Sequence, residues 1–274
     1  MKCTKVCLIV LAMTPAGIAP APAPTSERRS RRKRRPTATR CSWATSCTRS
    51  TSTLYSKLGY DFVKDFAPVS LLASTPNIVV VHPSVPAKSV KELIALSKAR
   101  PGQLDFASSG SGSSAHLAGE LFSSMAGTKM NHIPYKGGGP AVIALVGGQV
   151  SVGFATTPSV IQHVKSGRLR GLAVTSAQRS PSTPDLPTVS ESSLPGYEVL
   201  GWYGLLAPSG TSKEIVSRLH AESVKSLKLP DVKDRLDATG FEPIGTTPDQ
   251  FGSYIRTEVE KWSKVVKAAG VRAD

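Results

Sequence analysis

Hydroxyl side chains and glycines alternate in one short stretch, Ser108-Ser109-Gly110-Ser111-Gly112-Ser113-Ser114. The stretch follows a predicted strand and precedes a predicted helix. Glycines let the backbone approach a ligand, and the first N–H groups of a helix are unpaired and carry partial positive charge. Such a turn suits an anion, for example a carboxylate or a phosphate, although a plain strand-to-helix connection has the same composition.

The same arrangement recurs twice. Tyr135-Lys136-Gly137-Gly138-Gly139-Pro140 joins a strand to a helix start and adds a cation, and Ala155-Thr156-Thr157-Pro158 does so with hydroxyls. The carboxyl ends of parallel strands share one sheet edge, which is where open α/β sheets bind ligands. We therefore predict a ligand site at Ser108, Ser109, Gly110, Gly112, Ser113, His116, Tyr135, Lys136, Gly137, Gly138, Thr156 and Thr157.

Two of these residues have a second interpretation. His116, in the first turn of its helix, can reach a bound anion or serve local packing and capping. Lys136 can hold the ligand or be a solvated turn lysine. The five histidines form no HExxH or HxH pair, and we find no catalytic constellation, so the sequence predicts a binding protein and no enzyme; the histidines are His82, His116, His132, His163 and His220.

Cofactor and metal sites are also not predicted. Gly110, Gly112 and Ala115 fit the dinucleotide pattern GxGxxG/A, but residues 131–136 lack the acidic residue that should end the next strand. Gly112 stands where a G-x-S-x-G elbow needs serine, and the P-loop Lys-Ser/Thr is absent. The cysteines have no zinc-ligand spacing, and all lie near the N-terminus, at Cys3, Cys7, Cys41 and Cys47.

The N-terminal segment, residues 1–53, differs from the remainder. It contains 11 of the 34 Lys and Arg residues and one acid, which gives +10, whereas the remainder carries +5. The basic run Arg28–Arg35 can bind nucleic acid or anionic lipid, so a basic-tailed nucleic-acid- or partner-binding protein is the alternative function. No aromatic residues interleave the run, and we expect no nucleic acid partner.

Export is predicted from the first residues. Lys2 and Lys5 precede the apolar stretch Val6–Met13, and the small-residue stretch Ala19–Ala23 follows, as in a short signal peptide. We therefore expect a periplasmic protein. Ser26–Thr53 has almost no aliphatic residue, so we expect it to be disordered.

After Leu54 strand and helix signals alternate, which predicts an α/β fold with mostly parallel sheets and flanking helices. Strands are expected at 77–81, 104–107, 130–135, 150–155, 169–175 and 204–207. Helices are expected after Ser89, the Gly/Ser turn, Pro140, Pro158 and Thr211, at 231–239, and after Thr247, which forms a capping box with Gln250.

From Leu54 onward the sequence resembles the Bug family of solute-binding proteins of tripartite tricarboxylate transporters. The matching stretches are Leu54–Leu58, Asp61-x-x-Lys64-Asp65-Phe66-x-Pro68-Val69, Val80-Val81-His82-Pro83, Ser108–Ser114 with His116-Leu117-Ala118, His132-x-Pro134-Tyr135-Lys136-Gly137, Arg179-Ser180-Pro181, Asp185-x-Pro187-Thr188, Pro195-Gly196-Tyr197 and Trp202–Thr211.

The resemblance implies a two-lobed, monomeric, type II-like periplasmic binding protein without a cofactor. Its first lobe would comprise residues 54–101 and 201–274, and its second lobe residues 102–200. The lobes would close on a small carboxylate (a di- or tricarboxylate, amino acid or aromatic acid) and deliver it to a membrane permease. The family pattern places ligand contacts on the same three turns.

The N-terminal region departs from the family. Members begin the first lobe with a strand, a glycine-rich loop and a helix, and none of these is visible here. Arg35–Tyr55 resembles a typical family stretch read in another frame, so we hypothesise a frameshift. An incomplete first lobe would expose apolar surface, so we predict impaired ligand binding and a second lobe that is better ordered than the first.

Overall fold

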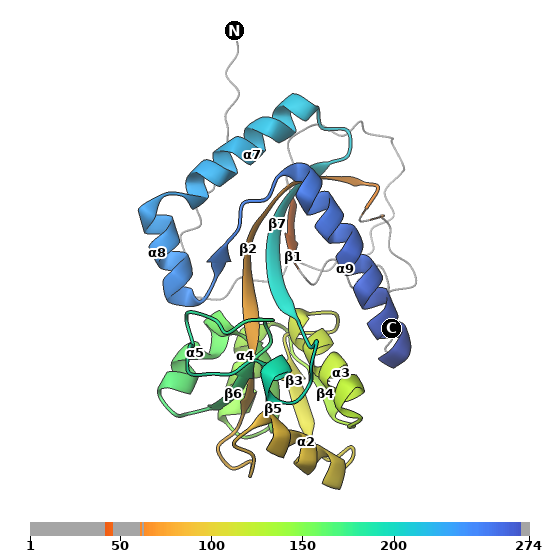
Figure 1. Cartoon of the computed structure of the whole chain (residues 1–274), viewed down its shortest axis with the longest axis vertical. Coiled ribbons are helices and arrows are strands. Elements are labelled where there is room, and N and C mark those ends of the chain that lie inside the picture. The colour runs from red at the N-terminus through yellow and green to blue at the C-terminus, as the bar shows by residue number, and fades with distance from the viewer. Residues whose placement is uncertain (1–41, 46–60, 62, 270–274) are drawn as a thin grey trace, which may run out of the picture. The chain divides into compact units, whose positions relative to one another are not determined.

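One long strand, β2 (Phe66–Val81), takes part in both halves of the sheet in this computed structural model (Figure 1). The structure describes residues 42–45, 61 and 63–269. The predicted signal peptide, the basic tail and the frameshift hypothesis fall on residues outside these ranges, apart from 42–45.

The other elements follow in chain order. They are β1 (Ser42–Thr45), α2 (Val90–Ala99), β3 (Asp105–Ser108), α3 (Ser114–Ala126), β4 (Asn131–Pro134), α4 (Gly138–Val146), β5 (Val152–Thr156), α5 (Thr157–Lys165), β6 (Arg170–Val174), α6 (Val189–Ser192), β7 (Leu200–Pro208), α7 (Lys213–Leu227), α8 (Pro230–Thr239), β8 (Glu242–Pro243) and α9 (Pro248–Ala269).

The sheet is mixed. Its strand order is β1-β7-β2-β5-β3-β4, and β6 and β8 also pair with β2. Residues 66–76 of β2 pair antiparallel with β7, and residues 77–81 pair antiparallel with β5 and β6. Among the described strands, only β3–β4 and β3–β5 are parallel pairs. The α/β class is confirmed, but the expected mostly parallel pairing holds only around β3, because β2 runs against its neighbours through both halves.

The expected helices are all present. The capping box before α9 is confirmed, since the N–H of Thr247 donates to Gln250 Oε1 at 3.0 Å and the N–H of Gln250 donates to Thr247 Oγ1 at 3.3 Å. The N-cap of α7 lies one residue later than predicted. Ser212, and not Thr211, accepts the first-turn N–H of α7, from Ile215.

Two apolar clusters occupy different ends of β2. Leu71, Trp202 and Phe251 belong to a cluster formed by β2, β7 and the first half of α9. A larger cluster contains Phe106, Phe122, Phe154, Val79, Leu93 of α2, and Trp262 and Val266 from the second half of α9. The packing therefore groups α2 and residues 77–81 with residues 102–200, whereas the predicted lobe boundary separated them; the division into two lobes itself stays a prediction.

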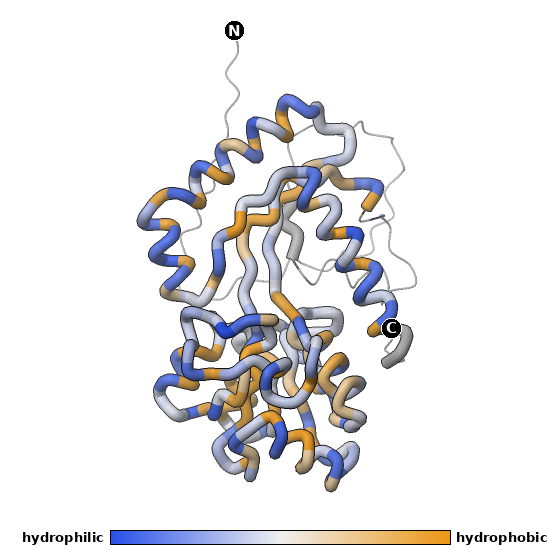
Figure 2. Tube along the Cα trace, in the orientation of Figure 1, coloured by the Kyte–Doolittle hydropathy of each residue, from blue (hydrophilic) through white to orange (hydrophobic). Residues whose placement is uncertain are grey.

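The helices α7 and α8 contribute least to the interior. Neither contains a fully buried side chain, and hydrophilic and hydrophobic residues alternate along both (Figure 2). Val216 and Leu219 of α7 pack, half-buried, against Val69 and Leu205 of the sheet. None of the described helices has the length and apolar character that crossing a bilayer requires.

Candidate functional site

The three predicted turns begin at one edge of the sheet. In the parallel pairs, Ser108 of β3 lies opposite Pro134 of β4, and Ala107 of β3 lies opposite Gly153 of β5. Each of these strands leads into a helix, α3, α4 or α5. The structure therefore gathers three turns and three helix N-termini, as the spacing of the sequence motifs predicts.

The Gly/Ser turn is folded by its own hydroxyls. Ser108 Oγ donates to the carbonyl oxygen of Gly110 at 3.2 Å and accepts the Gly110 N–H at 3.1 Å. Ser113 Oγ donates to the same carbonyl at 2.7 Å and caps α3. Gly110 and Gly112 have φ of 130° and 78°, where a side chain would be strained. Ser108 and Ser113 are buried, so they shape the turn, whereas Ser109 is half-buried.

Two histidine rings lie against this turn. His116, 2% exposed, accepts the Gly112 N–H at Nδ1 (3.0 Å), and its Nε2 lies 3.6 Å from Glu120 Oε1. The ring of His132 stacks on that of His116 with centroids 3.8 Å apart, and its Nε2 lies 2.6 Å from Ser108 Oγ. Burial is the main cause that lowers the pKa of His132 to about 3, and a positive charge on His116 would lower it further.

The second turn is tied to the first by backbone hydrogen bonds. The N–H of Tyr135 donates to the carbonyl of Ser108 at 3.0 Å, and the N–H of Gly137 donates to that of Ser109 at 3.2 Å. Gly137 caps α4 with φ of 107° and provides no side-chain cap bond. The first N–H groups of α4 are therefore not engaged by a capping side chain, and Lys136 beside them is exposed.

The third turn contains two threonines with different roles. Thr156, half-buried, directs its hydroxyl to Ser159 Oγ at 3.2 Å, and makes no cap bond to α5. Thr157 is fully buried and donates to the carbonyl of Pro76 at 2.9 Å. Gly138 of the second turn lies nearby, because a Cβ there would be 3.9 Å from Ser159 Cβ. The Thr156 hydroxyl thus bonds within its own turn, whereas the Thr157 hydroxyl bonds to β2.

Sequence reasoning did not select two polar residues here. Asn77 of β2 accepts the Ser114 hydroxyl at Oδ1 (3.3 Å), is fully buried, and its Nδ2 has no hydrogen-bond partner among the described residues. His132 appeared in the list of histidines and in a stretch that carries the family resemblance, but not among the predicted site residues. His132 lies opposite Phe106 in the register, and Ser108 follows Phe106 by two residues on β3, so His132 and Ser108 lie on the same face of the sheet. This alternation of side chains along a strand was the available signal.

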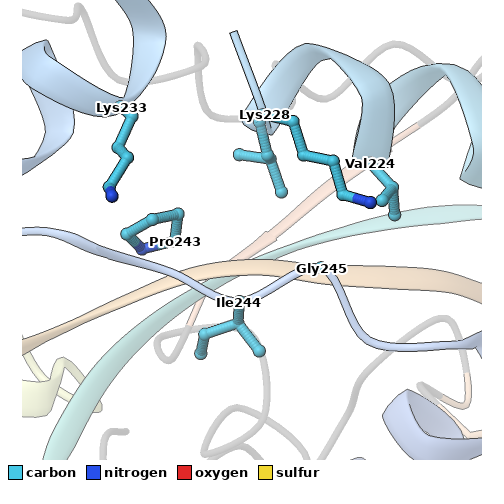
Figure 3. A pocket seen from close by; sticks show the side chains of 7 residues that line it. Val224, Lys228, Lys233, Pro243, Ile244 and Gly245 are labelled. Carbon is cyan, nitrogen blue, oxygen red and sulfur yellow. The ribbon is translucent and has the colours of Figure 1, made fainter. Parts of the chain in front are cut away.

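A hollow of about 310 Å³ lies elsewhere, between α7, α8 and β8 (Figure 3). It is lined by Val224, Leu227, Lys228, Lys233, Pro243, Ile244 and Gly245. None of these residues belongs to the three turns. Within the described ranges, no group of three or more His, Cys, Asp or Glu side chains could hold a metal ion.

The sequence has clear relatives. The BugT protein of Bordetella pertussis is 37% identical over 219 residues, which are 80% of this chain and 67% of that protein. A protein of Pseudomonas sp. from the tcbD-tcbE intergenic region is 38% identical over 77% of this chain and 63% of its own length. The chain thus spans about two thirds of the length of these relatives.

Solved structures agree. A protein of R. palustris solved with adipate superimposes with a TM-score of 0.79 and 36% identity, over 84% of this chain and 77% of that one. The periplasmic binding protein BugD gives 0.80 and 30%, over 88% and 81%. MatC of Rhodopseudomonas palustris, solved with bound malate, gives 0.76 and 30%, over 82% and 78%.

A family-wide comparison matches residues 40–271 to the tripartite tricarboxylate transporter family receptor. This match includes all three turns and every described element of the fold. The chain therefore belongs to this receptor family, the family of the Bug solute-binding proteins.

Proposed function

We propose that this protein captures a small carboxylate in the periplasm and delivers it to the membrane permease of a tripartite tricarboxylate transporter. The observation that carries the proposal is the convergence of the α3, α4 and α5 N-termini on the edge formed by β3, β4 and β5. Binding requires no chemical step, so the proposal includes neither catalysis nor a cofactor.

The donors in the turns suit a carboxylate. A helix N-terminus presents unpaired N–H groups and the positive end of the helix dipole. α4 and α5 both lack a side-chain cap bond, which leaves their first N–H groups for an anion, apart from Pro140 and Pro158, which have no N–H. Thr156 and Ser109 are half-buried beside them, and Lys136 adds a cation. These residues are the proposed ligand contacts, together with the backbone of Gly137 and Gly138.

Relatives support the proposed ligand class and the proposed periplasmic location. The R. palustris structure contains adipate, MatC contains malate, and BugD is described as a periplasmic binding protein. We propose the same class of ligand here, and a monomer of two lobes that close around it. Because residues 77–99 pack with residues 102–200, we place the lobe boundary within β2 and not at residue 101.

The test is ligand-dependent stabilisation of the purified full chain. Adipate, malate and citrate would each be added, and the melting temperature measured. A ligand at 100 times its Kd stabilises by about 2.7 kcal/mol, which for a domain of about 150–250 residues raises the melting temperature by roughly 5–11 °C. No shift with any carboxylate in a panel, from a protein that melts cooperatively, would remove the proposed function.

A matched pair of glycine variants locates the site. Gly137 and Gly167 both have positive φ, 107° and 71°, and a Cβ at either would have no atom within 4 Å. Alanine should therefore strain both positions by about 1–3 kcal/mol. Only Gly137→Ala should lose the ligand-induced shift, since Gly167 lies at the far end of α5. Equal retention of the shift in both variants would exclude the α4 turn from the site.

A further inference from the structure

The rings of His116 and His132, here called the histidine pair, both contact residues of the Gly/Ser turn. His116 Nδ1 accepts the Gly112 N–H at 3.0 Å. His132 Nε2 lies 2.6 Å from Ser108 Oγ, and that hydroxyl exchanges two hydrogen bonds with the backbone of Gly110. The start and the end of the turn are thus fixed by two rings that stack on each other.

The contact between His116 and the turn requires a neutral His116 ring. The Gly112 N–H uses the lone pair of His116 Nδ1, so the proton of that ring must be on Nε2, which faces Glu120. A charged His116 would place a second N–H against the N–H of Gly112. The ring centroids are 3.8 Å apart, so two charged rings would repel strongly. Burial also keeps His132 neutral, with its pKa near 3.

Few ionisable groups on the surrounding elements could favour protonation of the histidine pair. Glu120 is the acid in contact with His116 among the described residues. Asp105 of β3, Glu258 of α9 and Tyr197 each make hydrogen bonds of their own. The strands β2 and β5, which also pack against α3, contain no ionisable side chain. Glu120 is therefore the acid that favours a charged His116, whereas the Gly112 N–H, which needs the lone pair of Nδ1, opposes it.

We propose that the histidine pair positions the Gly/Ser turn for anion binding, as neutral rings that do not touch the ligand. The inference rests on the proposed function and narrows it. The bound anion is held by backbone N–H groups and hydroxyls, and not by an imidazolium. Its affinity therefore does not tighten as the pH falls through the usual histidine range, as it would if His116 bound the anion as a cation.

Nitrogen NMR of the imidazoles tests the protonation state directly. In the ¹⁵N-labelled full chain between pH 8 and 6, His116 should show an unprotonated Nδ1 and a protonated Nε2, and His132 should stay neutral. Adipate and malate affinities, measured in parallel at pH 8 and pH 6, should agree within about twofold. An imidazolium signal from His116 at pH 6, or an affinity that rises severalfold on acidification, would overturn the inference.

Two substitutions separate positioning from mere packing. The side-chain oxygen of asparagine can replace Nδ1 as the acceptor for Gly112, whereas leucine cannot. His116→Leu should lower adipate and malate affinity by at least about tenfold, the equivalent of one lost hydrogen bond. His116→Asn should restore affinity to within about threefold of the wild type, although it also lacks the stacked ring.

Hydrogen exchange at the Gly112 amide gives a readout that needs no ligand. The amide should exchange at least about tenfold faster in His116→Leu and near the wild-type rate in His116→Asn. If the wild type binds neither adipate nor malate, the ligand class fails, but the exchange rates still decide the role of His116. If His116→Leu does not fold, the wild-type NMR decides it. Equal exchange and equal affinity in both variants would refute positioning.

Discussion

Replacing Gly119 with alanine should destabilise the wall of the candidate site. Gly119 lies inside α3, and a Cβ there would lie 2.3 Å from Cε2 and 2.7 Å from Cδ2 and Cζ of Phe106. Phe106 is fully buried. It stacks on His132 with ring centroids 5.0 Å apart and meets Phe154 edge-on at 5.8 Å, so the ring has no free space on either side.

The expected cost follows from two opposing effects. Adding a methyl group to a packed core costs typically about 1–3 kcal/mol, and such a short approach favours the upper half of that range. Alanine recovers about 0.5–1 kcal/mol of helix propensity relative to glycine. The net destabilisation is therefore about 1–2 kcal/mol, or a fall of roughly 2–8 °C in melting temperature for a domain of about 150–250 residues.

The assay is thermal and urea unfolding of the purified chain, with two controls. Gly138→Ala adds the same methyl group at the start of α4, where the nearest atom would be Ser159 Cβ at 3.9 Å, and should be neutral or slightly stabilising. Phe106→Leu should reduce the cost of Gly119→Ala, because a smaller side chain leaves room for the Cβ. If Gly119→Ala melts at or above the wild-type temperature, the close packing of Phe106 on α3 is wrong.

Three further predictions concern single side chains. The folded state keeps His132 neutral to about pH 3, whereas the unfolded chain protonates it below about pH 6.5, so stability present above pH 6.5 is lost progressively as the pH falls toward 3. The full pKa shift corresponds to a loss of about 2 kcal/mol of unfolding free energy at pH 5, and to about half of that after solvent screening of a half-buried ring. In urea unfolding, His132→Gln should lose less stability on acidification than the wild type, and an identical pH profile would contradict this. Tyr197→Phe should cost about 1–2 kcal/mol in thermal unfolding, because the buried carbonyl of Ala118 loses the hydroxyl that donates to it at 2.8 Å; an unchanged melting temperature would show that this bond contributes nothing. Thr247→Ala should lower stability by about 1 kcal/mol in urea, since the capping box with Gln250 is lost, and an unchanged midpoint would argue that the start of α9 is fixed by packing alone.

Much of the fold could be predicted because glycine and proline punctuate short strands and helices from residue 77 onward. The first part of β2, residues 66–76, was missed. It contains Pro68 and Pro76, which argue against a central strand, and its pairing with β7 is a contact across more than a hundred residues. Local sequence cannot show such a partner. The two-residue strand β8 is too short to leave a pattern.

The location of the candidate site could be predicted, but not which hydroxyls face outward. Thr156 and Thr157 are identical neighbours in the sequence, yet only Thr157 is buried, because Pro76 of β2 accepts its hydrogen bond. Ser108 is likewise turned inward by His132. These assignments depend on side chains brought in by other strands, so motif reasoning alone names the turn and not the contacting atom.

The packing of α9 bears on the expectation that one lobe is better ordered than the other. Phe251 and Ile255 of this helix belong to the cluster around Leu71 and Trp202, whereas Trp262 belongs to the cluster that surrounds α3. Because this helix of 22 residues packs in both clusters, local unfolding of its first half should also weaken the packing of its second half. We therefore expect a lesion in the first cluster to loosen α3 as well, so hydrogen-exchange protection lost in one part alone would contradict this coupling.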